Sequence, residues 1–267
     1  MKGLGDIYAT LGRTTLAVQL QYRAELVIWL LGLVLQPVIY LVVWTTVTRV
    51  QGGTVGGMTA GDFAAYYILY MVINHLTFTW IMFEFEFRVR NGSFSPLLLQ
   101  PLHPIHRDIV DNIAYKALTL TLTVPVAFLL AWVFEPTFVW QRWSLIAFIP
   151  ALALAFLLRF MVEWSLALAA FWTTRVTALN EIYMGLAFFL SGYMAPLELM
   201  PDWVQTVAAV FPFRWMVVFP VELLLGRLTP DQALYGFAAQ IVWLGLAFAL
   251  ISLVWSRGAK RYAAVGS

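Results

Sequence analysis

Six long apolar stretches occupy most of this 267-residue chain. A helix needs about 20 predominantly apolar residues to cross the roughly 30 Å hydrocarbon core of a bilayer. The composition agrees, because 62% of the residues are hydrophobic and 11% are charged, whereas soluble domains average about 25% charged residues. We therefore predict an all-α polytopic membrane protein, a single transmembrane domain over 1–267, with helices at 26–47, 63–83, 114–134, 143–170, 177–193 and 233–255.

The positive charges fall mainly between alternate pairs of these stretches. With an inside N-terminus, 11 of the 16 Lys and Arg residues lie in inside segments and one, Arg159, lies within a span. The four on the outside are Arg49, Arg142, Arg214 and Arg227. Cytoplasmic loops are enriched in Lys and Arg, and an even number of spans returns the chain to its starting side. Both termini are therefore expected in the cytoplasm.

The segment before the first span, residues 1–23, is amphipathic. Leu4, Ile7, Leu11, Thr15 and Val18 recur at three- and four-residue steps, which is typical of one helical face. Such a helix is expected to lie in the membrane interface with its apolar face in lipid. The alternative is a helix packed against its own protein.

The predicted cytoplasmic loop at 91–106 is unusually apolar. It reads NGSFSPLLLQPLHPIH, and an apolar cluster exposed to water usually marks a partner surface. Its prolines restrict it to short helical pieces, with Pro96 well placed to start one. The alternative is a loop folded back on the helices or the membrane. His103 and His106 lack a third nearby ligand, so a metal site is not favoured.

Two groups of polar residues fall within predicted spans. Arg159 and Glu163 form an i,i+4 pair in the fourth span, and Asn74 and His75 lie in the second. Charges at membrane depth are candidates for function and need a partner, and here each is the other's expected partner. Two readings stay open: part of a transport path, or a structural ion pair with interhelical hydrogen bonds.

The stretch 193–228 is predicted outside and yet is strongly apolar. Gly192 and Pro196 break the fifth helix, Met200-Pro201-Asp202 reads as a helix start, and Gly226 as a helix end. Two short apolar helices here predict a re-entrant hairpin, whose irregular backbone must be buried in protein or line a cavity. Thr229-Pro230 then predicts the start of the last helix.

Catalytic motifs are missing from the sequence. It has no GxxxxGK[ST] phosphate loop, no HExxH and no GxSxG. It has no cysteine, which excludes disulfides and thiol chemistry. An enzyme is therefore not expected, and Arg159 and Glu163 leave open an ATP-independent channel or a proton- or ion-coupled carrier.

Two blocks of the sequence resemble the ABC-2 family of transporter permeases. One is Gly192-x3-Pro196-x4-Pro201 followed by Pro212, which is similar to that family's motif between its last two helices. The other is GSFSPLLLQPL at 92–102, which resembles a loop used as a coupling helix by a branch of uncharacterised permeases. Together the blocks make the resemblance more specific than either alone.

The resemblance implies the membrane subunit of an exporter in the cytoplasmic (inner) membrane, most consistent with a hydrophobic or amphipathic substrate. Separate ABC ATPase subunits would bind ATP and Mg²⁺, this chain would bind no cofactor or nucleic acid, and a second permease, identical or homologous, would complete a dimer. An extracellular gate would contain Gly192, Pro196, Pro201 and Pro212. ATPase coupling would fall to Gly92, Phe94, Pro96, Leu97, Leu98, Leu99, Pro101 and Leu102.

Overall fold

The computed structural model describes residues 3–21, 23–173 and 175–262. Within these residues, the first half of the chain forms a helix pair, a two-stranded hairpin and four further helices. Their bounds are α1 Leu4–Gln21, α2 Arg23–Val50, β1 Thr54–Val55, β2 Met58–Thr59, α3 Ala60–Thr77, α4 Ile81–Arg90, α5 Ser95–Leu98 and α6 Pro104–Phe134.

The second half adds two long helices and a set of short ones. Their bounds are α7 Arg142–Ala167, the 3₁₀ helix η1 Leu168–Phe171, α8 Thr177–Leu190, the 3₁₀ helix η2 Leu197–Leu199, α9 Asp202–Val210, α10 Phe213–Met216, α11 Val218–Leu224 and α12 Pro230–Arg261. The strands pair antiparallel, with Thr54 opposite Thr59 and Val55 opposite Met58.

Four helical segments of the described chain are long and apolar enough to cross a membrane. They are Ala60–Arg90, Pro104–Phe134, Arg142–Phe171 and Pro230–Arg261. Two shorter apolar helical segments, Val34–Val50 and Thr177–Leu190, lie at the first and fifth predicted spans. The chain is thus a helical membrane protein, and crossing by these two shorter segments stays a prediction.

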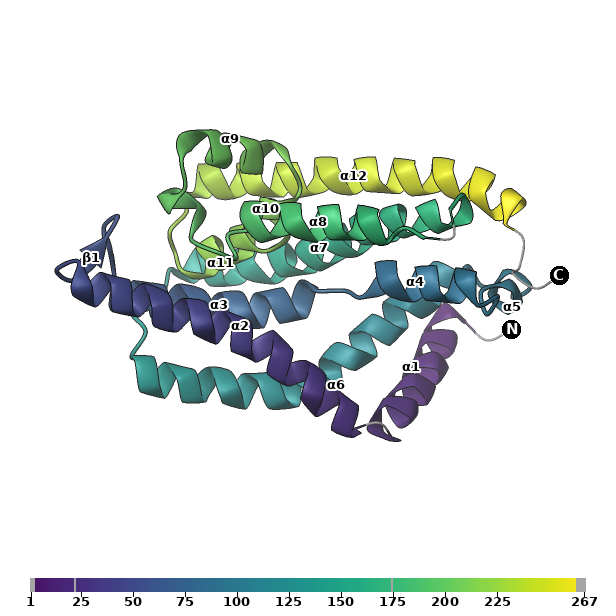
Figure 1. The fold of residues 1–267 in the computed structure, drawn as a ribbon, viewed down its shortest axis with the longest axis horizontal. Helices are drawn as coiled ribbons and strands as arrows, with labels where there is room; N and C mark the ends of the chain where they lie inside the picture. The colour runs from purple at the N-terminus through teal and green to yellow at the C-terminus, as the bar shows by residue number, and fades with distance from the viewer. Residues whose placement is uncertain (1–2, 22, 174, 263–267) are drawn as a thin grey trace.

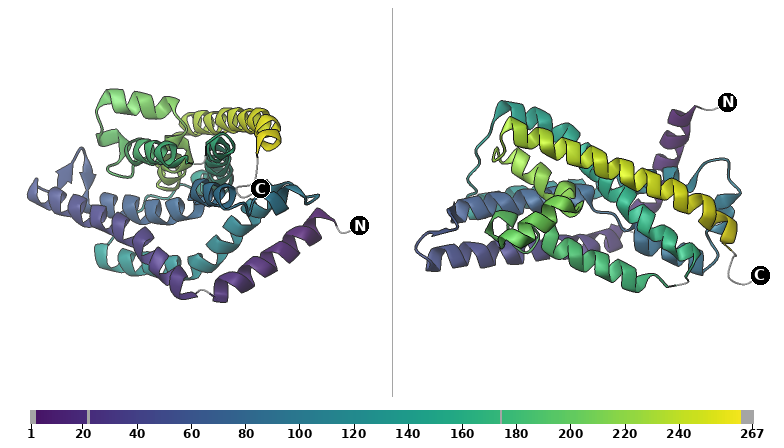
Figure 2. Two further views of the ribbon diagram at one scale, coloured as in Figure 1. Left: turned by 45° about the vertical axis from the view of Figure 1, so that its right-hand side comes forward. Right: turned by 90° about the horizontal axis from the view of Figure 1, so that it is seen from above.

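The bundle has two distinct ends (Figure 1). One, the α5 end, holds α5, the start of α1 and the end of α12; the other, the hairpin end, holds β1–β2 and α9. The views in Figure 2 show the same separation along the long axis. Segments predicted to be inside therefore gather at one end and segments predicted to be outside at the other.

Helix α7 lies at the centre of the bundle and contacts α3, α4, α11 and α12. Two apolar clusters surround it. The cluster towards the hairpin end is built from α3, α7 and α10–α12, with Phe63, Trp215 and Phe219 buried. The cluster towards the α5 end includes Phe85 and Trp164. Burial of large side chains on both clusters fixes the helices relative to α7.

Several predicted boundaries needed correction. The second predicted helix, 63–83, is two helices, α3 and α4, separated by residues 78–80. The third begins at Pro104 rather than 114, because His103 caps it and proline suits its first turn. The stretch 193–228 holds three short α-helices, α9–α11, rather than two. The predicted starts at Asp202 and Pro230 agree with the structure.

Helix α1 packs on its own protein, as the alternative reading of the N-terminal segment described. Tyr8 Oη lies 2.7 Å from His106 Nδ1 at the start of α6, and Thr15 hydrogen-bonds Asp111. Val18 and Leu20 nevertheless stay half exposed. The packing is compatible with a helix at the interface, and that location stays a prediction.

Candidate functional site: a polar break beside a groove

The second membrane segment is interrupted at Phe78, Thr79 and Trp80. Thr77 Oγ1 donates to the carbonyl of Ile73 at 3.0 Å, a local bond that competes with regular helix geometry. Phe78 N still donates to the carbonyl of Asn74, and its own carbonyl accepts from Lys116 Nζ at 2.7 Å. A buried lysine therefore satisfies a carbonyl that the broken helix leaves free, as irregular backbone at membrane depth requires.

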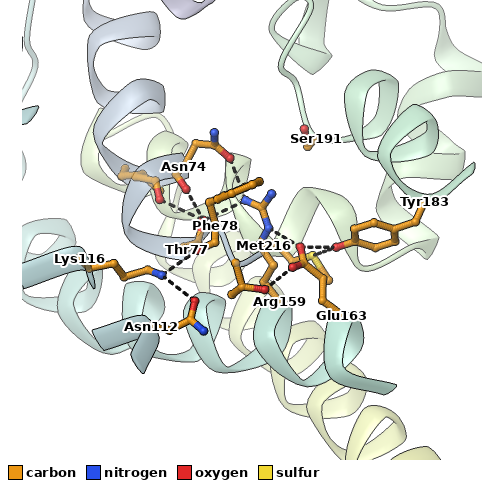
Figure 3. A network of polar contacts seen from close by, with 12 residues as sticks. Asn74, Thr77, Phe78, Asn112, Lys116, Arg159, Glu163, Tyr183, Ser191 and Met216 are labelled. Carbon is orange, nitrogen blue, oxygen red and sulfur yellow. Dashed lines mark hydrogen bonds and ion pairs between the residues drawn. The ribbon is translucent and has the colours of Figure 1, made fainter. Parts of the chain in front are cut away.

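Arg159 and Glu163 of α7 lie against this break (Figure 3). Their side chains are 8% and 1% exposed, and Arg159 Nε donates to Glu163 Oε1 at 2.9 Å. Glu163 also accepts from Thr79 Oγ1 and from Tyr183 Oη. The carboxylate of Glu163 thus accepts hydrogen bonds from three residues.

The guanidinium of Arg159 extends from this pair to α3. Its Nη1 donates to Asn74 Oδ1 at 2.8 Å and approaches Thr77 Oγ1 at 3.4 Å. Its Cζ lies 5.0 Å from the centre of the Phe78 ring, a cation–π arrangement. One arginine therefore ties α7 to the last turn of α3 and to the break itself.

A groove of about 1320 Å³ runs past this network. Residues of α1–α4 and α6–α8 line it. Arg159, Asn74 and Phe78 line it at mid-depth, and Tyr70, Ser191 and Tyr193 line it towards the hairpin end. At the α5 end, the lining includes the ion pair of Arg88 Nη2 and Asp108 Oδ1, 2.8 Å apart.

The four intramembrane residues singled out from sequence do not form one group. Asn74, Arg159 and Glu163 meet in one network. His75 points to α6, where its Nε2 lies 2.7 Å from Thr119 Oγ1, and no contact among the described residues joins it to Arg159. A relay through His75 therefore lacks a connection in this structure.

Three network residues went unrecognised in the sequence. Thr79 and Tyr183 gave no signal, because threonine and tyrosine are ordinary in membrane helices. Lys116 did give one: it lies two residues inside the predicted third span and was counted only as an inside charge. Its side chain is buried, and Nζ lies 4.9 Å from the centre of the Phe156 ring.

The predicted gate segment is clamped by tyrosines of α3. Tyr66 Oη donates to the carbonyl of Gly192, Tyr67 Oη to that of Met194, and Tyr70 Oη lies 2.9 Å from Ser191 Oγ. Gly192 has a φ of +69°, and an added Cβ would lie 2.4 Å from Tyr66 Oη. Glycine is needed here for both backbone conformation and space.

The three predicted gate prolines occupy different surroundings. Pro196 and Pro212 are buried, whereas Pro201 is exposed at the start of α9. Nearby, burial raises the pKa of Glu222, an effect that Arg214 opposes from 3.0 Å. The segment is thus a packed structure, and its role as a gate stays a prediction.

The loop predicted for ATPase coupling divides into inward and outward residues. Phe94 and Leu97 are buried in the cluster at the α5 end, and Gly92 turns the chain there with a φ of +77°. Leu98 and Leu102 are half-buried. Leu99 is 88% exposed, and the neighbouring Pro96 and Pro101 are also exposed. Only the outward residues are free to contact another protein directly, and the coupling role of the loop stays a prediction.

Both histidines of this loop have apolar or aromatic neighbours. The ring centre of His103 lies 4.3 Å from that of Trp255, and burial, with a smaller effect of His106, lowers the pKa of His103. Across the described residues, no three His, Asp or Glu side chains are grouped to hold a metal ion.

Comparison with known proteins follows this geometry. A family model described as ABC-2 family transporter protein matches residues 34–266. Comparisons with curated proteins and with solved structures gave no match. The matched region includes the groove-lining helices from residue 34 on, the loop at 91–106 and the clamped segment at 191–196.

Proposed function

Because the chain belongs to the ABC-2 family of transporter proteins, we propose that it is the permease subunit of an exporter driven by a separate ABC ATPase. The substrate is hydrophobic or amphipathic, and a second permease, identical or homologous, completes the pathway. Family membership makes this chain the membrane component, and the structure supports how it would be driven.

The observation that carries the proposal is the exposed tip of the loop at 91–106. Leu99 stands out at the α5 end, with Pro96 and Pro101 beside it. An exposed leucine flanked by prolines on a short, rigid turn is suited to docking in an apolar cleft of a partner protein. An ABC ATPase is the partner expected for a permease of this family.

The base of the tip is anchored in aromatic packing. The ring centre of Phe94 lies 4.6 Å from that of Phe85 on α4 and 5.6 Å from that of Phe171 on η1. Tyr262, beyond the end of α12, also contacts Phe94. A push on Leu99 therefore moves α4 together with its neighbours, because closely packed interiors transmit displacement.

The break at 78–80 allows α4 to move relative to α3. Hinges are a few residues between rigid elements that absorb backbone change. Here the hinge is held by Lys116, Arg159 and Glu163, and Arg159 faces the groove. Docking and ATP-driven closure of the ATPase would thus alter the groove at mid-depth, and the segment at 191–196 would open towards the other side.

The test is co-expression of the permease with its ABC ATPase, followed by purification and by ATP-dependent uptake of a hydrophobic dye into inside-out vesicles, whose lumen corresponds to the outside of the cell. Leu99→Asp should leave folding unchanged and lower ATPase association and export at least about tenfold. Val50→Asp is the matched control, because Val50 is 81% exposed but ends α2 just before the β1–β2 hairpin.

Two outcomes would overturn the proposal. One is the absence of any associated ATPase together with wild-type export by Leu99→Asp. The other is a flux through the permease alone that follows pH or voltage, which would favour an ATP-independent channel or carrier.

A further inference from the structure

The wall of the groove presents hydrogen-bond donors at mid-depth. Arg159 uses Nε for Glu163 and Nη1 for Asn74 Oδ1 and Thr77. The Tyr183 hydroxyl also interacts with the guanidinium, and no described residue accepts from Nη2 in the way that Glu163 and Asn74 accept from Nε and Nη1. The side chain is 8% exposed and lines the groove, so a charged and nearly buried group retains N–H capacity towards the groove.

Asn74 adds a second hydrogen-bond donor beside Arg159. Its Oδ1 accepts from Arg159, which leaves the Nδ2 amide as a donor. Within the described chain, that atom has no partner, and Asn74 lines the groove beside Arg159. Figure 3 shows the Asn74 amide beside the Arg159 guanidinium, at the end of the network nearer to Ser191.

Glu163 balances the charge of Arg159 and binds the guanidinium through Nε. It is 1% exposed and does not line the groove. Its oxygens accept from Arg159, Tyr183 and Thr79. A ligand beside Asn74 and Arg159 therefore meets amide and guanidinium donors and not the Glu163 carboxylate, and in surroundings of low polarity such donors favour a negatively charged acceptor.

Apolar and aromatic side chains also line the groove near these donors. They include Phe78, Met184 and Phe188. We propose that the groove binds an amphipathic anion, whose carboxylate, sulfonate or phosphate oxygens accept from Arg159 Nη2 and Asn74 Nδ2 while its apolar body lies along these side chains. The inference rests on the proposed permease function and names the class of its substrate.

The test measures binding to the complete permease in nanodiscs of zwitterionic lipid, without ATPase. The probe is radiolabelled dodecanoate, compared with dodecanol and dodecylammonium, which have the same chain with neutral and cationic heads. Dodecanoate should bind at least about tenfold more tightly than either. Dodecyl phosphate should compete with it, because it has the same class of head.

The decisive variant is Asn74→Asp. It replaces the free donor by an acceptor, and the new carboxylate can pair with Arg159, so folding is retained. Dodecanoate affinity should fall at least about tenfold, and the preference for dodecylammonium should rise. Asn91→Asp is the matched control, because Asn91 is exposed at the α5 end and its Oδ1 already accepts from Ser93, as a carboxylate can.

Each possible result of the test leads to a different conclusion. Competition by phosphatidic acid within the nanodisc identifies a bilayer source for the anion, and its failure identifies an aqueous source; both support the site. Equal binding of the three heads, or unchanged dodecanoate binding by Asn74→Asp, overturns it. Because no ATPase is present, that failure leaves the proposed permease function standing.

Discussion

At the scale of single residues, the ion pair Arg159–Glu163 links α7 to other segments of the chain and does not only connect two turns of α7. The spacing of the two residues identified the pair in the sequence. Their contacts with Asn74, Thr79 and Tyr183 come from three other segments of the chain, which no local pattern reveals. A buried ion pair with further hydrogen bonds orders the elements that supply those bonds.

Removal of one member of this pair should lower the stability of the folded protein. Arg159→Met leaves Glu163 nearly buried without its counter-charge, and such changes lower the free energy of unfolding by about 3–5 kcal/mol. Adding Glu163→Gln removes the stranded charge and keeps hydrogen bonding to Thr79 and Tyr183. Denaturation of the detergent-solubilised protein should show the double variant to be more stable than Arg159→Met. Equal stability of the two would contradict a shared buried pair.

Gly192 provides a second test at this scale. Gly192→Ala places a methyl group 2.4 Å from Tyr66 Oη and 2.6 Å from Val218 Cγ2, at a φ of +69°. We expect a loss of roughly 1–3 kcal/mol in the free energy of unfolding, as for other strained positions. Gly185→Ala is the control, because nothing lies within 4 Å of its added Cβ and it lies within α8. That variant should be neutral or more stable by up to about 1 kcal/mol. Similar thermal stability of the two variants would refute the packing argument.

At the scale of elements, the sequence predicted helix starts better than helix interruptions. Thr229 and Pro230 begin α12 with a capping box, because caps are local and leave a sequence signal. The break at 78–80 contains neither glycine nor proline, and it is held by Lys116, which is distant in sequence. The inward burial of Phe94 left no local signal in the sequence, because its aromatic partners come from α4, η1 and α12.

The start of α6 should respond to pH. His103 Nδ1 accepts from Ile105 N at 3.3 Å, and a protonated ring would lose this acceptor. Its pKa is lowered in the folded protein, so below its ordinary value of 6.5 the unfolded chain takes up the proton first. The free energy of unfolding should therefore fall as the pH drops from 7.5 to 5.0.

Comparison with His103→Asn isolates this contribution. Asparagine also caps helices but does not titrate, so its thermal midpoint should fall less over the same pH range. Parallel pH profiles of the two proteins would show that His103 does not contribute.

At the scale of the whole molecule, the charge pattern and the architecture agree on two opposite ends. Arg49 and Arg142 begin or end helices at the hairpin end, and Arg90 lies near α5. Because the positive-inside rule depends on the charge of whole loops, the two ends can be predicted from the sequence without knowing how the helices pack. The groove could not be foreseen, since its walls combine residues of α1–α4 and α6–α8.

The orientation of these ends in the membrane can be tested directly, because the chain has no cysteine. A single cysteine in Leu99→Cys, at a position 88% exposed, should react with a membrane-impermeant maleimide only in inside-out vesicles. Thr54→Cys in the exposed hairpin should react in intact cells. Ala64→Cys, at a fully buried position, should react in neither preparation, so its signal measures background labelling. Labelling of Leu99→Cys in intact cells would place the loop on the wrong side for a cytoplasmic ATPase, and the proposed coupling would fail even if the helical fold is correct.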